Sequence, residues 1–218
     1  MPAVLAGSNC TIVATSFNPS VFTQLWMADN QIIARDDFQA GGVFTDIVVQ
    51  AQAGRFAIVV LPQQLMLIPR TPEDAAQAIA APPLQAIVQK VPHTPFVAVG
   101  LNFVWQTEPL EAAGSTTRTL FAPPSRLSTR FGASDARFGS YLSMDFDGSR
   151  LRLDVRPIRD LTAPGKERIQ CAFNVQRELA EKTPEQKVAS ISELVNQWDR
   201  LKEHTRELAN IAMETGAA

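Results

Sequence analysis

Hydrophobic residues form three runs between residues 42 and 70, and two-residue breaks at Ala53-Gly54 and Pro62-Gln63 separate them. Short apolar runs joined by tight turns are typical of antiparallel strands, so this segment predicts a three-stranded β-meander. The second and third runs, 56–61 and 65–68, are almost purely apolar. Such strands are covered on both faces or lie at the centre of a sheet under helices. We therefore expect the meander in the middle of the core.

Further strands are predicted at 10–17, 96–106 and 168–175, where apolar residues recur with a period of two. Residues 138–146 and 149–157 predict a hairpin around Asp147-Gly148, a pair that favours the type I′ turn.

The register of this hairpin follows from its two-residue loop, which places Asp145 opposite Arg150 and Met144 opposite Leu151. One face of the hairpin is then apolar and is expected to lie on the core: Leu142, Met144, Leu151, Leu153 and Val155. The other face is polar and is expected to meet water or a partner: Tyr141, Ser143, Asp145, Arg150, Arg152, Asp154 and Arg156.

Helices are predicted after Asn18, Thr71 and Thr183, because each of these capping residues precedes a proline suited to the first helical turn. The expected ranges are 19–28, 71–80 and 184–214, with a further helix at 84–91 after the break at Pro82-Pro83. The C-terminal helix has an apolar stripe at spacings of three and four: Ile191, Leu194, Trp198, Leu201, Thr205, Leu208 and Ala212.

The order of these elements predicts an α+β fold with mainly antiparallel sheet in a pseudo-duplicated β-α-βββ-α arrangement and a long C-terminal helix. The two halves are residues 1–92 and 93–218. An alternative that fits nearly as well is one continuous domain, in which the last helix packs on a single eight-stranded sheet. Residues 107–137 form an irregular connection with a short helix expected at 125–130. A connection of this length inside a compact domain is usually functional or disordered.

Composition narrows the class of protein. The chain has 218 residues, 45% of them hydrophobic, and a net charge of −2, so it can bury a core without disulfides or metals. Its two cysteines, Cys10 and Cys171, form no metal or redox motif, which favours a reduced cytoplasmic location. We expect no signal peptide and no membrane span, since the apolar runs are shorter than the ~20 residues that cross a bilayer.

Arginines concentrate between residues 116 and 168, a segment that contains ten basic and six acidic residues. Because guanidinium groups bind phosphates and carboxylates in a bidentate manner, this region suggests an anion-binding surface for nucleic acid or a nucleotide. The candidate residues are Arg130, Arg137, Arg150, Arg152 and Arg156. The simpler interpretation is a solvated sheet face whose charges pair with Asp145, Asp154 and Asp160, and the modest excess of charge favours it.

No motif for catalysis, metal binding or cofactor binding is present, so we expect a non-enzymatic protein without a cofactor or metal. His93 and His204 have no partner at a zinc-ligand spacing, and Asp145, Asp147 and Asp154 are better explained by the hairpin. A pocket for a small ligand near Trp105 and Trp198 is a third, weaker idea.

The C-terminal helix is the preferred binding element. At about 1.5 Å per residue it is about 45 Å long, whereas a strand of ordinary length spans about 20 Å. Its second half is therefore expected to project past the sheet and meet a second copy of the chain or another protein. The leading hypothesis is a protein-binding subunit or adaptor that associates through Ile191, Leu194, Trp198, Leu201, Leu208 and Ala212.

Overall fold

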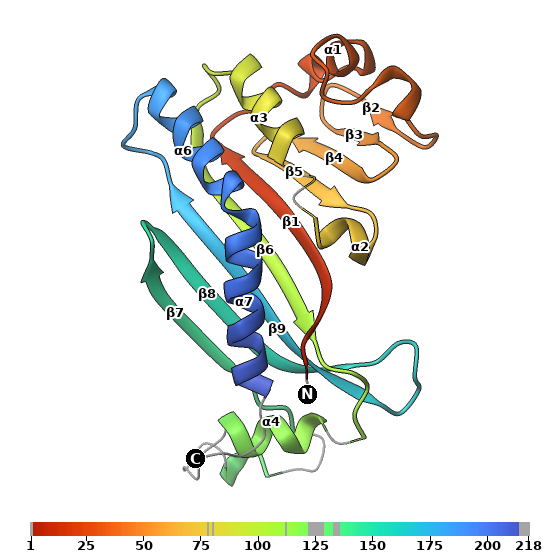
Figure 1. Ribbon diagram of the computed structural model, residues 1–218, viewed down its shortest axis with the longest axis vertical. Helices are drawn as coiled ribbons and strands as arrows, with labels where there is room; N and C mark the ends of the chain where they lie inside the picture. Colours follow the sequence, from red (N-terminus) through yellow and green to blue (C-terminus); the bar gives the residue numbers. More distant parts are fainter. Residues whose placement is uncertain are drawn as a thin grey trace.

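The computed structural model describes residues 2–77, 79, 81–111, 113–121, 129–132 and 136–213. It is an α+β structure with one antiparallel sheet of nine strands in the order β2-β3-β4-β5-β1-β6-β9-β8-β7. Helices α3, α6 and α7 lie over one face of this sheet (Figure 1). The predicted fold class, α+β with a mainly antiparallel sheet, is confirmed.

The strands differ greatly in length. The longest ones occupy the centre of the sheet and its β8 side, and the shortest, β2, forms one edge. Their bounds are β1 Val4–Ala14, β2 Val43–Phe44, β3 Val49–Gln52, β4 Phe56–Leu61, β5 Gln64–Pro69, β6 Phe96–Gln106, β7 Ser140–Phe146, β8 Ser149–Arg159 and β9 Glu167–Glu178.

Two of the three predicted caps begin α-helices, whereas Asn18 caps only a 3-10 turn at Pro19–Val21, and the helix expected at 19–28 begins later, at Gln24, after Thr23. Thr71 and Thr183 both accept a backbone hydrogen bond at a helix start, and Thr183 forms a complete capping box with Gln186. The helix bounds are α1 Gln24–Asp29, α2 Pro72–Ala75, α3 Ala81–Lys90, α4 Ala113–Phe121, α6 Pro184–Asn196 and α7 Trp198–Met213, with 3-10 turns η1 Pro19–Val21 and η2 Arg35–Asp37.

The β7–β8 hairpin has the predicted register. Asp145 lies opposite Arg150, Met144 opposite Leu151, and Leu142 opposite Leu153. The turn residues Asp147 and Gly148 have φ angles of 50° and 67°, and such left-handed angles define a type I′ turn. Local turn chemistry and a period-two pattern were therefore sufficient to align these two strands.

The core lies between the sheet and the helices. Along each central strand every second side chain is buried, as in Cys10 and Ile12 of β1 and Leu101 and Phe103 of β6. Trp198 of α7 meets Phe103 edge-to-face, with ring centroids 5.2 Å apart. The opposite side chains of the same strands stay partly accessible, so the helices cover only one face of the sheet.

Several predicted element boundaries were wrong. The first strand begins at Val4 rather than residue 10, and the helix predicted at 71–80 ends after one turn at Ala75. Pro82 and Pro83 belong to the first turn of α3, where a proline costs nothing because the first backbone N–H groups have no helical partner.

The C-terminal segment also differs from the prediction. It is two helices separated at Gln197, and α7 does not project past the sheet, because Thr205, Ala209 and Met213 are fully buried. The length comparison failed because β6 has 11 residues and β9 has 12, so they are about 36–40 Å long at about 3.3 Å per residue. His204 of α7 stacks on Phe146 with ring centroids 4.5 Å apart.

The predicted core face of the hairpin is only partly buried. Leu151 and Val155 are in the core, but Leu142 and Met144 of β7 are 52% and 47% exposed. The reason is position: β7 is an edge strand, and the helices lie over the middle of the sheet (Figure 1).

The irregular connection contains a helix that the sequence did not reveal. Helix α4 packs near the ends of β8 and β9 and buries Ala113 and Thr117. Of the short helix expected at 125–130, only Thr129 and Arg130 are among the described residues.

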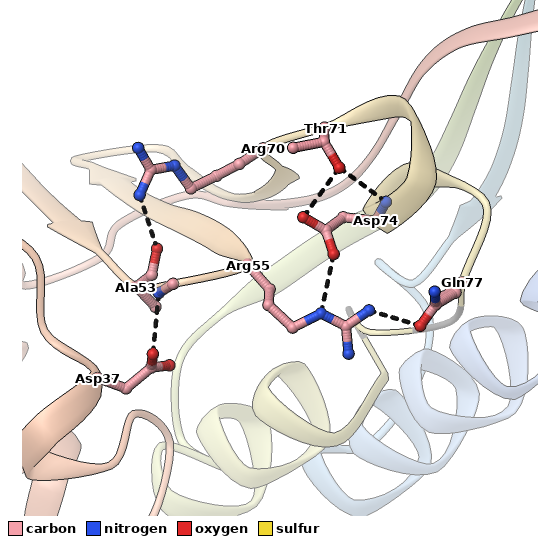
Figure 2. A network of polar contacts seen from close by, with 8 residues as sticks. Asp37, Ala53, Arg55, Arg70, Thr71, Asp74 and Gln77 are labelled. Carbon is pink, nitrogen blue, oxygen red and sulfur yellow. Dashed lines mark hydrogen bonds and ion pairs between the residues drawn. The ribbon is translucent and has the colours of Figure 1, made fainter.

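A polar network ties the β3–β4 turn to α2 (Figure 2). Arg55 Nε donates to a carboxylate oxygen of Asp74 at 2.8 Å, Thr71 caps the backbone N–H of Asp74 at 3.1 Å, and Arg70 donates to the carbonyl oxygen of Ala53 at 3.1 Å. The hydrogen bond from Arg55 holds the pKa of Asp74 below its usual value. These groups satisfy one another, so the network is structural.

Candidate functional site

The face of the sheet opposite the helices, called here the open face, has no covering layer among the described residues. Strands β1 to β6 contain no charged residue at all. Their half-exposed side chains on the open face are apolar or amides and hydroxyls: Asn9, Thr11, Val13, Gln50, Ala57, Val59, Leu61, Gln64, Met66, Ile68, Asn102, Val104 and Gln106. A face kept in water by solvation alone normally carries charges, so this composition is unusual.

A row of three asparagines crosses the open face on strands β1, β6 and β9. Asn9, Asn102 and Asn174 are in register as direct cross-strand neighbours. Nδ2 of Asn174 donates to Oδ1 of Asn102 at 2.9 Å, and Nδ2 of Asn102 donates to Oδ1 of Asn9 at 2.7 Å. Because the amides point the same way, each bond polarises the next.

Arg152 of β8 extends this row. Its Nη1 donates to Oδ1 of Asn174 at 3.4 Å and to Oε1 of Gln176 at 3.0 Å. The three amides and the guanidinium are together called the asparagine row, and its side chains are held in place by hydrogen bonds to one another. Asparagine is disfavoured in strands, so three in one register require an explanation beyond strand formation.

The other arginines predicted on this face have acidic partners. Arg150 pairs with Asp145 at 2.9 Å, as the hairpin register predicted, and Arg156 lies 3.8 Å from Asp154. Their charges are therefore largely compensated locally. Arg152 differs because its guanidinium donates to the neutral amides of Asn174 and Gln176.

A hollow of about 470 Å³ lies on the open face beside the asparagine row. Tyr141, Arg152 and Asp154 line it together with Asn102 and Asn174. It joins an exposed aromatic ring, one cation, one anion and several amides, which suits hydrogen bonding to a mixed polar surface.

Arg137 lies apart from this face, in an end pocket of about 820 Å³ between α4 and the β8–β9 loop. Arg137 pairs with Glu167 at 2.6 Å, and Lys166 lies 3.3 Å from Glu111. Arg130 is exposed and lies with Thr129 in a short helical segment. The five candidate arginines do not form one cluster, because three of them, Arg150, Arg152 and Arg156, lie on β8 and the other two lie elsewhere.

Asp160 also lines the end pocket. Its carboxylate accepts hydrogen bonds from the hydroxyl and the backbone N–H of Thr162, at 2.6 and 2.7 Å, and pairs with Arg168 at 2.8 Å. These contacts lower the pKa of Asp160 to about 2, with the Thr162 hydroxyl making the largest contribution. Two of the cations that line the pocket, Arg137 and Lys166, have an acidic partner within it.

The helix residues predicted to bind a partner lie mostly in the core. Ile191, Leu194, Trp198 and Leu201 are fully buried against the chain's own sheet, and only Leu208 and Ala212 are half-buried. Trp105 is buried too, and its indole N–H donates to Thr205 at 3.1 Å. These side chains hold α6 and α7 in place, so a partner would have to approach other residues.

Among the described residues, no three His, Cys, Asp or Glu side chains are grouped so that they could hold a metal ion. No helix in the same part of the chain has both the length and the apolar character to cross a membrane. Cys10 and Cys171 are free, buried thiols.

Sequence reasoning missed the asparagine row. Each asparagine occupies an ordinary polar position of an alternating strand, and Asn9 lies outside the predicted first strand. A common register for β1, β6 and β9 could have revealed the row, but that register joins segments far apart in the chain.

Comparison with known proteins gives no family assignment: the chain matches no protein-family model and no curated protein.

Proposed function

We propose that this protein is a non-enzymatic binding subunit whose partner protein packs on the open face of the sheet. The observation that carries the proposal is the absence of charged residues from strands β1 to β6, which leaves an uncharged, half-exposed surface. Depletion of charge is the compositional mark of the central part of a protein interface. The charged strands β7 and β8 then correspond to its polar rim.

The size of this surface fits the proposal. At about 3.3 Å per residue and about 4.8 Å per strand, β1 and β3–β6 present about 600 Å², and β9 raises the area to about 800 Å². That is about what each partner contributes to an interface of standard size. The expected partner is a folded protein. Its surface should be apolar where it contacts Val59 and Met66, and it should carry hydrogen-bonding groups where it contacts the asparagine row.

Site-specific photocrosslinking in the source cells tests this function. A benzophenone side chain in place of Met66 should give one dominant adduct with a second protein species. The same group in place of Leu25, which is exposed on α1, should not give that adduct. Met66→Arg should abolish an adduct formed from a probe at Val13, and Leu25→Arg should leave it unchanged.

Two outcomes would contradict the proposal. One is the same set of adducts from the probes at Met66 and Leu25, which would indicate random collision. The other is an adduct that contains only a second copy of the chain, since the proposed occupant is a different protein.

We infer that the two halves of the chain arose by duplication. In support, the order of regular helices and strands is β-α-βββ-α-α in each half when β2 is set aside, with β1, α1, β3–β5, α2 and α3 matched by β6, α4, β7–β9, α6 and α7. Read outward from the centre, the sheet order is β1-β5-β4-β3 on one side and β6-β9-β8-β7 on the other, so β1 corresponds to β6 and β5 to β9. A superposition that failed to overlay β1 on β6 together with both meanders would refute it.

Binding of nucleic acid or a nucleotide by β8 is the second candidate. Arg152 supports it, because its guanidinium is held extended by neutral amides. This function predicts that the chain is retained on DNA or RNA at low salt and that the retention weakens steeply as the salt concentration rises. The double substitution Arg150→Ala with Arg152→Ala should reduce the retention.

The cytoplasm is the proposed location of the protein. The free thiols of Cys10 and Cys171 support it.

A further inference from the structure

The two edges of the sheet are not equivalent. One edge is β2, which has only two residues, and the other is β7, which has seven. Natural sheets protect a long edge with lysine, proline, a bulge or a covering element. The β7 sequence, SYLSMDF, contains neither lysine nor proline, and within the described part of the chain no strand pairs with its outer side.

Large apolar side chains accompany this unpaired edge. Tyr141 is 66% exposed on the open face, while Leu142 and Met144 are exposed on the face that the helices cover elsewhere. An edge that offers backbone hydrogen bonds and apolar side chains together is a ready template for another strand.

The hairpin register defines which backbone groups are available. The two-residue turn makes Phe146 and Ser149 a hydrogen-bonded pair, and such pairs alternate along an antiparallel ladder. The even-numbered residues of β7 therefore bond to β8. The N–H and C=O groups of Tyr141, Ser143 and Asp145 point away from β8 toward the outer side.

These outward groups are self-complementary. If two copies of β7 run antiparallel with Ser143 opposite Ser143, Tyr141 of each copy lies opposite Asp145 of the other. All three residues then exchange both backbone hydrogen bonds. Leu142 lies opposite Met144 of the other copy in a non-hydrogen-bonded pair, the kind in which side chains lie closest together. In this register no two like charges lie opposite each other.

We propose that the chain forms a two-fold symmetric dimer in which β7 pairs with β7 of a second copy about Ser143. Such an isologous contact uses the same patch on both copies and closes on itself. It joins two nine-stranded sheets into one, with both open faces on the same side. The dimer is independent of the proposed function, because the open face of β1 to β6 stays accessible in it.

A cysteine at the symmetry axis tests the register. Paired Cα atoms in a hydrogen-bonded position are about 5.5 Å apart, within the range that a disulfide spans. Oxidation of Ser143→Cys should therefore yield a covalent dimer. The native thiols do not interfere, because Cys10 and Cys171 are buried and burial raises the pKa of Cys171 to about 12.

Two control variants distinguish cross-linking within the dimer from cross-linking by random collision. Tyr141→Cys should not cross-link, because the two copies of residue 141 lie about 13 Å apart along the strands at about 3.3 Å per residue. Leu161→Cys, at a side chain 95% exposed, reports random encounter. At about 10 μM chain, Ser143→Cys should cross-link roughly 100-fold faster than Leu161→Cys, given an effective concentration of about 1 mM inside a dimer.

Light scattering provides a second readout. The unmodified chain should elute with double its monomer mass at low and at high salt, because the contact is apolar and backbone-bonded. Leu142→Lys with Met144→Lys should give folded monomers by circular dichroism, and Ile47→Lys, at another exposed apolar residue, should stay dimeric. A monomeric unmodified chain, or equal cross-linking of Ser143→Cys and Leu161→Cys, would overturn the proposal.

Discussion

Thr205 shows at the scale of one residue why a polar group belongs in an apolar stripe. It is fully buried on α7, and its hydroxyl accepts the indole N–H of Trp105 at 3.1 Å while donating to the carbonyl oxygen of Lys202 at 2.9 Å. In the sequence it is the one hydroxyl-bearing residue of the apolar stripe on the C-terminal helix. In the structure it fastens that helix to β6.

Replacing Thr205 with valine should therefore destabilise the fold. The substitution keeps the shape but leaves the Trp105 N–H buried without an acceptor, which costs about 1–3 kcal/mol of the free energy of unfolding. Urea denaturation followed by tryptophan fluorescence measures the loss. Thr205→Ser, which keeps the hydroxyl, is the control and should retain most of the stability; an unchanged midpoint for the valine variant would refute the role.

Asp160 gives a pH-dependent prediction at the same scale. Its pKa in the folded state is about 2, below the ordinary carboxyl value, because Thr162 and Arg168 favour the charged form. The contribution to stability is therefore full above the unfolded pKa of about 4 and is lost as the pH falls toward about 2.

Asp160→Asn should consequently lower the urea midpoint at pH 7, and the difference from the unmodified chain should shrink as the pH falls from about 4 to about 2. Asp46→Asn, at an exposed position in the β2–β3 turn, should have little effect at any pH. A difference that grows on acidification would have the wrong sign and would exclude the Asp160 contacts as its cause.

At the scale of one element, α7 behaves as part of the core. Ending the chain after Glu203 removes Thr205, Ala209 and Met213, all fully buried, and exposes the apolar face of β6 and β9 beneath them. The sequence predicted instead that this second half of the C-terminal helix projects past the sheet. The length of the central strands reverses that expectation.

The truncated chain should lose on the order of 5 kcal/mol of stability through the exposed apolar surface. Near-ultraviolet circular dichroism and urea denaturation measure whether tertiary packing survives. A chain that ends at Met213 is the control and should unfold like the unmodified protein. Cooperative unfolding of the shorter chain at the unmodified midpoint would show that α7 is dispensable.

At the scale of the whole molecule, the sheet order predicts a gradient of local stability. Strands β1, β6 and β9 are paired on both sides and covered by helices, so their amides should exchange most slowly with deuterium. The edge strands β2 and β7 should exchange fastest. Within β7 the amides of Tyr141, Ser143 and Asp145 should be protected at high chain concentration and exposed on dilution, if the edge pairs with a second copy.

The sequence alone was sufficient wherever the deciding interactions are local. The β7–β8 register, the Thr71 and Thr183 caps and the range of β6 follow from turn residues, caps and periodicity within a few positions. The same local rules predicted the apolar meander and the α+β class. They also gave the Asp145–Arg150 ion pair, because a two-residue turn leaves only one register.

Contacts between distant segments were beyond those rules. The pairing of β1 with β6 brings together residues more than 80 positions apart, and together with the pairing of β6 with β9 it creates the asparagine row. Such pairings depend on which closed arrangement buries the most apolar surface, and a one-residue change of register would turn every side chain to the other face. The hydrophobic pattern therefore determined what each segment became, whereas the packing of segments across the chain determined which surfaces were left for a partner.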